Sequence, residues 1–187
     1  MVGCDVALLD QRFLGGGQYS GRDSDYVVFS FPGYSPHWAL TRPWLTEEWY
    51  ASTIRDLAAQ ISQTQRIVFV EFDQVIGRVS DSDYWAGLPC TLARPATIED
   101  AAALFRNASH VYAGRLHAAI LGSVLGVPTL AFAYHHKFEV VSELGIPTVG
   151  LTGPCATLPK PERPDMTILE SVRQRGLDVL SSVRTDG

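Results

Sequence analysis

The chain has 187 residues, of which 46% are hydrophobic, and this is enough to bury one sizeable core in a single domain. Its net charge of −5 provides no global basic field for nucleic acid or an anionic membrane, so any anion has to be bound locally. The three cysteines are far apart and odd in number, and no run approaches the roughly 18 apolar residues of a membrane span, so we expect a cytoplasmic protein with no transmembrane segment.

In chain order, residues 1–25 contain LGGGQYSG and are interpreted as a linker that leads into the domain. From residue 26 onward, short β-branched or aromatic runs alternate with helical patterns, and the polar segment 75–85 has no periodicity that resolves it. Strands are predicted at about 26–31, 66–72, 90–93, 110–113 and 129–133, and helices at about 46–63, 97–107, 115–125 and 137–144.

This alternation predicts an α/β fold, a Rossmann-like parallel sheet flanked by helices over residues 26–152. Residues 153–165 contain four prolines and are interpreted as an extended connector. Residues 166–187 are predicted to form a C-terminal helix that packs on the same domain.

The stretch YAGRLHAAILGSVLGVP, residues 112–128, combines an almost entirely apolar helix with Arg115 and His117 at its start. A guanidinium in the first turn after a strand can grip a carboxylate or phosphate where helix N–H groups also favour anions. The imidazole of His117 can serve as a general acid or base. The alternatives are that Arg115 pairs with an acid of a neighbouring loop, Asp81 or Asp83, and that His117 is a core histidine bonded to a carbonyl.

A second cationic cluster, Tyr134-His135-His136-Lys137, follows the next predicted strand and should reach the same sheet edge. Lys137 could bind a phosphate and Tyr134 could donate its hydroxyl, whereas a solvated loop is the alternative. The two histidines lack a third ligand at helical spacing, and no phosphate-binding, dinucleotide or metalloprotease motif occurs, so we expect neither a metal site nor a cofactor. Asp81 and Asp83 could bind a cation or a sugar hydroxyl, but their context is typical of a polar turn.

Taken together, Gly114-Arg115-Leu116-His117, then Gly126-Val127-Pro128, Tyr134 with Lys137, and Glu143-Leu144-Gly145 resemble the C-terminal signature of the polysaccharide pyruvyltransferase family. The resemblance is strongest over residues 108–147, and Asp5 to Leu9 is similar to a family segment that leads into the second domain. One departure is Phe31-Pro32-Gly33-Tyr34, where family members often have an arginine.

The resemblance implies an enzyme that transfers a pyruvyl group from phosphoenolpyruvate to a sugar of a cell-surface polysaccharide precursor, such as an exopolysaccharide. It implies the fold of the C-terminal domain of a GT-B type transferase, with Arg115, Lys137, Tyr134 and Gly114 binding substrate and His117 catalytic. The expected partners are phosphoenolpyruvate and a glycan or lipid-linked sugar acceptor. The chain is about half as long as a typical family member. Three explanations are open: the sequence is a fragment, an N-terminal-half partner subunit completes the cleft, or a homo-oligomer does so.

Two other functions are compatible with the same residues. One is a GT-B type nucleotide-sugar glycosyltransferase, in which the same edge binds a diphosphate. The other is a catalytically silent half-domain that binds a glycan or a partner subunit through its open face.

Overall fold

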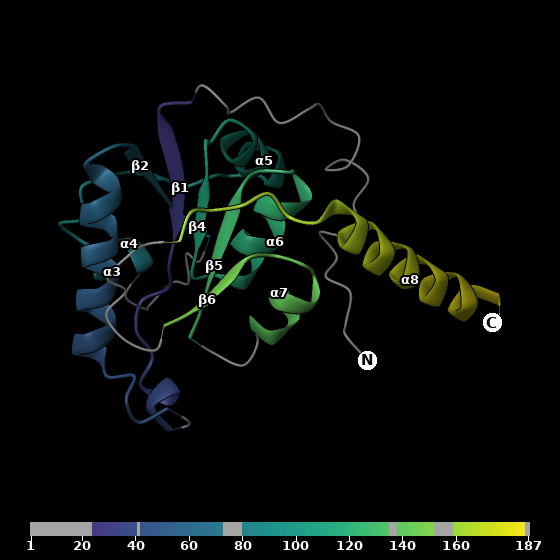
Figure 1. The fold of residues 1–187 in the computed structure, drawn as a ribbon, viewed down its shortest axis with the longest axis horizontal. Coiled ribbons are helices and arrows are strands. Elements are labelled where there is room, and N and C mark those ends of the chain that lie inside the picture. Colours follow the sequence, from purple (N-terminus) through teal and green to yellow (C-terminus); the bar gives the residue numbers. More distant parts are fainter. Residues whose placement is uncertain (1–23, 41, 73–79, 135–137, 152–158, 186–187) are drawn as a thin grey trace.

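The computed structural model describes residues 24–40, 42–72, 80–134, 138–151 and 159–185, without the side chains of residues 139 and 176–185. Its centre is a six-stranded sheet in the order β3-β2-β1-β4-β5-β6 with all neighbouring strands parallel (Figure 1). The strands are β1 (Tyr26–Ser30), β2 (Arg66–Val70), β3 (Cys90–Ala93), β4 (Val111–Ala113), β5 (Thr129–Ala133) and β6 (Thr148–Gly150). This confirms the α/β, Rossmann-like prediction. The order reverses between β1 and β4, the point at which ligands bind in such sheets.

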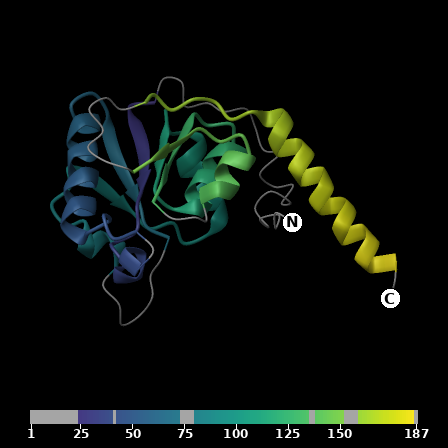
Figure 2. The ribbon, with the colours of Figure 1, turned by 60° about the horizontal axis from the view of Figure 1, so that its bottom comes forward.

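Helices cover both faces of the sheet. Helix α3 (Glu47–Ser62) lies on one face, and α5 (Ile98–Arg106), α6 (Leu116–Val124) and α7 (Glu139–Glu143) lie on the other (Figures 1 and 2). The short α4 (Asp81–Tyr84) lies near α3, since Arg55 donates to the Ala86 carbonyl at 3.4 Å. The four central strands β1, β2, β4 and β5 are therefore buried on both faces, which explains why they read as continuous apolar runs.

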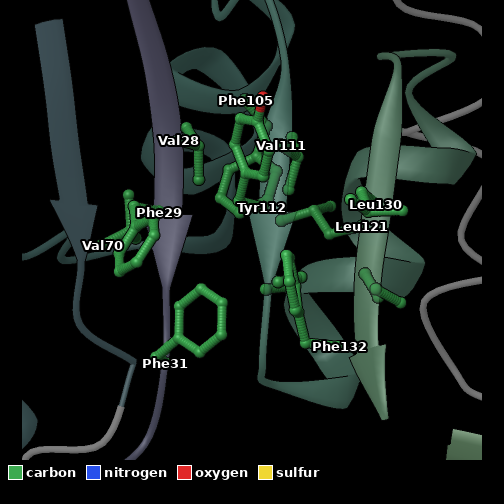
Figure 3. Packing of buried hydrophobic residues seen from close by; sticks show 14 of the residues in the cluster. Val28, Phe29, Phe31, Val70, Phe105, Val111, Tyr112, Leu121, Leu130 and Phe132 are labelled. Atoms are coloured by element: carbon green, nitrogen blue, oxygen red, sulfur yellow. The ribbon is translucent and has the colours of Figure 1, made fainter. Parts of the chain in front are cut away.

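Aromatic side chains in and next to the central strands pack within a core that is mainly aliphatic. Phe29, Phe31 and Phe132 are buried, and Figure 3 shows Phe31 beside β1 with Phe132 beyond it. The ring centroids of Phe31 and Phe132 are 5.2 Å apart. Helix α6 packs closely on this core, because a Cβ at Gly122 would come within 2.7 Å of the Thr129 hydroxyl. Its interior side chains are buried from Ala118 to Val124, as its uniformly apolar sequence requires.

Most predicted elements are confirmed to within a few residues. Thr46 caps α3 by accepting from the Trp49 amide, and the predicted capping box of Thr97 and Asp100 opens α5. Three short elements were not predicted: the 3-10 helix η2 (Pro36–Leu40), α4 and β6. Each has five residues or fewer, which is too short for a hydrophobic period to show.

The C-terminal helix α8 (Met166–Thr185) extends away from the sheet in Figures 1 and 2. Near its start, Leu169 and Val172 are buried. Before it, Thr129 donates its amide to the Glu162 carbonyl at 2.9 Å, next to β5. Most of the predicted linker and half of the predicted connector lie outside the described residues. Within the described part of the chain, no helix is both long and apolar enough to cross a membrane.

Candidate functional site

Residues that follow β1, β2, β4 and β5 line a pocket of about 250 Å³ at the carboxyl edge of the sheet. Its lining residues are Trp38, Phe72, Arg115, Leu116, His117, Tyr134 and Phe138. Three residues predicted from the sequence, Arg115, His117 and Tyr134, are thus brought together, as the parallel topology required. Lys137, with His135 and His136, lies outside the described residues.

The junction between β4 and α6 positions the first two of these side chains. Arg115 is the N-cap of α6 in an extended conformation, with φ −98° and ψ 131°, and its side chain does not cap the helix. His117, in the first turn of α6, has an exposed side chain. The positive end of the α6 dipole therefore lies beside the pocket, together with a guanidinium and an imidazole.

Asp81 is the ion-pair partner of Arg115. Arg115 Nε donates to Asp81 Oδ2 at 2.7 Å, and Nη2 donates to the same oxygen. The other oxygen, Oδ1, accepts from the Gly33 amide at 2.9 Å. The side chain of Asp81 is 9% exposed and that of Arg115 is 23% exposed. Asp81 thereby links the chain after β1 to the chain after β4.

This pair confirms one of the two alternatives for Arg115, an acid from a neighbouring loop. The Asp81 carboxylate offsets the charge of the guanidinium from within the protein. The Asp81 interaction fixes the orientation of a guanidinium that still lines the pocket. The guanidinium of Arg115 is therefore already oriented before a ligand enters the pocket.

Aromatic rings form the other side of the pocket. The Tyr134 ring lies 4.4 Å from Trp38, 5.4 Å from Phe138 and 5.9 Å from Tyr50, measured between centroids. Burial raises the pKa of the Tyr134 hydroxyl, an effect that Arg115 opposes and Asp81 reinforces. Tyr134 is therefore a neutral phenol that can exchange hydrogen bonds with a ligand but not supply charge. Trp38 and Phe138 were not among the predicted site residues. Trp38 lies in the unpredicted η2, and Phe138 is the N-cap residue of α7, inside the helix predicted at about 137–144.

Gly114, predicted to bind substrate, has a packing role in the structure. A Cβ at this position would come within 2.9 Å of Phe31 Cε1 and closer still to Cδ1, against a ring that is fully buried. The amides of Gly114 and Arg115 both donate to the Ser30 carbonyl, at 2.8 and 3.2 Å. Glycine at this position lets the β4 end lie close to β1 and holds Arg115 at the pocket.

Replacing Gly114 by alanine is expected to lower the free energy of unfolding by about 1–3 kcal/mol, because the new methyl group overpacks against Phe31. Thermal unfolding measures this loss. Adding Phe31→Leu removes the ring edge that the methyl meets, so the double variant should lose less than the sum of the two single variants. Strict additivity would contradict the packing role of Gly114.

In the described ranges, no group of three or more His, Cys, Asp and Glu side chains could hold a metal ion. The chemistry available to the described pocket is hydrogen bonding, charge pairing and proton transfer.

The chain matches a known protein family. A sequence-family model described as "Polysaccharide pyruvyl transferase" matches residues 2–136, more than two thirds of the chain. The match includes Arg115, His117 and Tyr134 and ends one residue before Lys137. No individual curated protein matches the chain.

Proposed function

Because the chain belongs to the polysaccharide pyruvyl transferase family, we propose that it transfers the pyruvyl group of phosphoenolpyruvate to a sugar of a cell-surface polysaccharide precursor. The observation that carries this proposal is the pocket at the β1–β4 reversal, which places Arg115 and His117 at the uncapped start of α6. Phosphoenolpyruvate has a phosphate and a carboxylate, and both are ligands that a guanidinium and helix N–H groups prefer.

In this proposal Arg115 binds an anionic group of the donor, Tyr134 donates its hydroxyl and Lys137 binds the phosphate. Gly114 would act indirectly: because it has no side chain, the end of β4 can lie close to β1, and Arg115 is held at the pocket. An N-terminal-half partner subunit or a second copy of the chain would supply the opposite wall of the cleft. The acceptor would be a glycan or a lipid-linked sugar.

His117 would move protons during the transfer. An acceptor hydroxyl adds to C2 of phosphoenolpyruvate and loses its proton, while C3 gains a proton and becomes a methyl group. The bond between C2 and the phosphate oxygen then breaks, a second hydroxyl adds to C2 and loses its proton, and the products are a cyclic ketal and inorganic phosphate. An imidazole beside the bound donor can give or take a proton in this sequence.

A nucleotide-sugar glycosyltransferase is the second candidate, because the strand order 3-2-1-4-5-6 is also that of dinucleotide-binding folds. In those folds an acid at the end of the second strand binds the ribose. The residue at that place is Glu71, which is 1% exposed and bound to Arg94 at 2.7 Å. Its carboxylate is therefore already used within the protein, which weighs against this candidate.

The test is titration calorimetry with phosphoenolpyruvate. Arg115→Lys keeps a positive charge beside Asp81 but loses the planar fork, and we expect about 10–100-fold weaker binding, from charge-assisted bonds of about 1.5–3 kcal/mol. Arg66→Gln is the matched control, since Arg66 is a half-exposed arginine paired with Asp25 at the opposite edge of the sheet. Equal affinities of parent and Arg115→Lys, or saturable binding of UDP-glucose with none of phosphoenolpyruvate, would contradict the proposal.

A further inference from the structure

A second depression lies on the same edge of the sheet, at the ends of β2 and β3. Its volume is about 500 Å³, and its lining includes Phe72, Arg94, Ala96, Thr97 and Ile98, with Glu71 behind them. Phe72 lines both this depression and the pocket of Arg115 and His117. The two cavities are therefore neighbours that share one aromatic wall.

Arg94 is the polar group that a ligand would meet in this depression. Its Nε donates to Glu71 Oε2 at 2.7 Å, and its Nη2 donates to the Ser82 hydroxyl at 2.8 Å. The Glu71 side chain is fully buried, whereas the Arg94 side chain is 49% exposed. Two contacts thus hold the guanidinium in place while half of its side-chain surface remains accessible.

The charge of Arg94 is balanced inside the protein. Burial alone would raise the pKa of Glu71, but the Ser82 amide, the Arg94 guanidinium and the Ser82 hydroxyl together lower it. Glu71 is therefore an anion at neutral pH. A ligand of Arg94 need not bring a negative charge, and hydroxyl groups that accept hydrogen bonds are sufficient.

The flanks of the depression are apolar and exposed. Phe72 is 36% exposed, and its ring lies 5.9 Å from that of the buried Phe105, which supports it from α5. Ile98, at the start of α5, is 44% exposed. An aromatic and an aliphatic side chain beside a fixed hydrogen-bond donor suit a ligand with an apolar face and a hydroxylated rim, which is the chemistry of a pyranose ring.

We infer that this depression binds the sugar ring of the acceptor, with its C–H face on Phe72 and hydroxyl groups on Arg94. The inference rests on the proposed function, since it assigns the second substrate to the cavity beside the donor pocket. A pyranose there would lie across Phe72 from Arg115 and His117, so a hydroxyl on that side could approach the bound donor.

Saturation-transfer NMR on the full chain tests this inference with methyl glycosides of galactose, glucose, N-acetylglucosamine and N-acetylmannosamine. We expect the parent to transfer saturation to the ring protons of at least one glycoside. Ala96→Trp fills the depression from an exposed position and breaks no described interaction, so the signal should fall at least fivefold. Phe72→Ala should weaken it similarly, whereas Leu92→Ala, which removes an exposed apolar side chain of β3, should not.

The inference would be overturned if the parent saturated none of the glycosides, or if Ala96→Trp left the signal unchanged. It would also be overturned if UDP-glucose, tested in a parallel sample, received saturation on its uracil ring rather than on its sugar ring. Phosphoenolpyruvate is absent from these samples. The two tests can therefore fail separately. If no glycoside binds, the calorimetric measurement of phosphoenolpyruvate binding still tests the proposed function, and if phosphoenolpyruvate does not bind, the NMR signal of the glycosides still tests this inference.

Discussion

Replacing His117 by alanine is expected to lower kcat for pyruvyl transfer by about 10²–10⁴-fold, the range that a positioned general acid or base contributes. His117 lines the pocket that we propose binds the donor, in the first turn of α6, and its side chain is exposed. Its loss should therefore leave the fold intact. The rate is measured as acceptor-dependent release of inorganic phosphate from phosphoenolpyruvate, alongside donor affinity by calorimetry.

His110→Gln is the matched control for this variant. His110 precedes β4 and so lies at the opposite edge of the sheet, where its Nδ1 is 3.2 Å from the Ser109 hydroxyl and burial lowers its pKa. We expect this control to keep the parental rate within about threefold. A His117→Ala enzyme that also stays within this range would show that the proton moves through another group.

Replacing Asp81 by alanine is expected to cost about 3 kcal/mol in the free energy of unfolding, because it leaves the partly buried Arg115 without its carboxylate. The value lies at the low end for broken buried pairs, since Arg115 retains some contact with water. In a chain of this length the melting temperature should fall by about 6–12 °C. The Gly33 amide also loses its acceptor.

Asp83→Ala provides the comparison, because Asp83 lies on the same short helix with an exposed side chain. It should change the melting temperature by about 2 °C or less, as surface substitutions usually do. Asp81→Asn keeps an acceptor for Gly33 but removes the charge, so an intermediate loss is expected. Equal losses for Asp81→Ala and Asp83→Ala would mean that the Arg115 pair does not stabilise the fold.

The sequence was sufficient to predict that the site residues converge. Parallel strands end at one edge, so Arg115 after β4 and Tyr134 after β5 had to lie near one another, and the structure places them in one pocket. The apolar body of α6 predicted its burial, and the spacing of Thr97 and Asp100 predicted the start of α5. These features depend on local pattern and topology alone.

The partner of Arg115 could not be decided in the same way. Asp81 and Asp83 are two residues apart in a polar segment without periodicity, and only their burial in the fold distinguishes them. Phe72 shows the same limit. It follows β2 as an ordinary apolar residue and becomes a wall between two cavities only because the fold brings the β4–α6 junction to one side of it and the segment from β3 to α5 to the other. The ion pair of Asp81 and the position of Phe72 between two cavities both depend on contacts between segments that are far apart in the sequence, and no local sequence pattern predicts such contacts.

The most direct test of pyruvyl transfer is ¹³C NMR with phosphoenolpyruvate labelled at C2, incubated with the protein and a glycan acceptor. We expect the labelled enol carbon to become a saturated ketal carbon attached to the sugar, C3 to become a methyl group, and one phosphate to be released for each ketal formed. Release of labelled pyruvate without a sugar adduct, or an unchanged label beside a sugar transferred from a nucleotide donor, would contradict it.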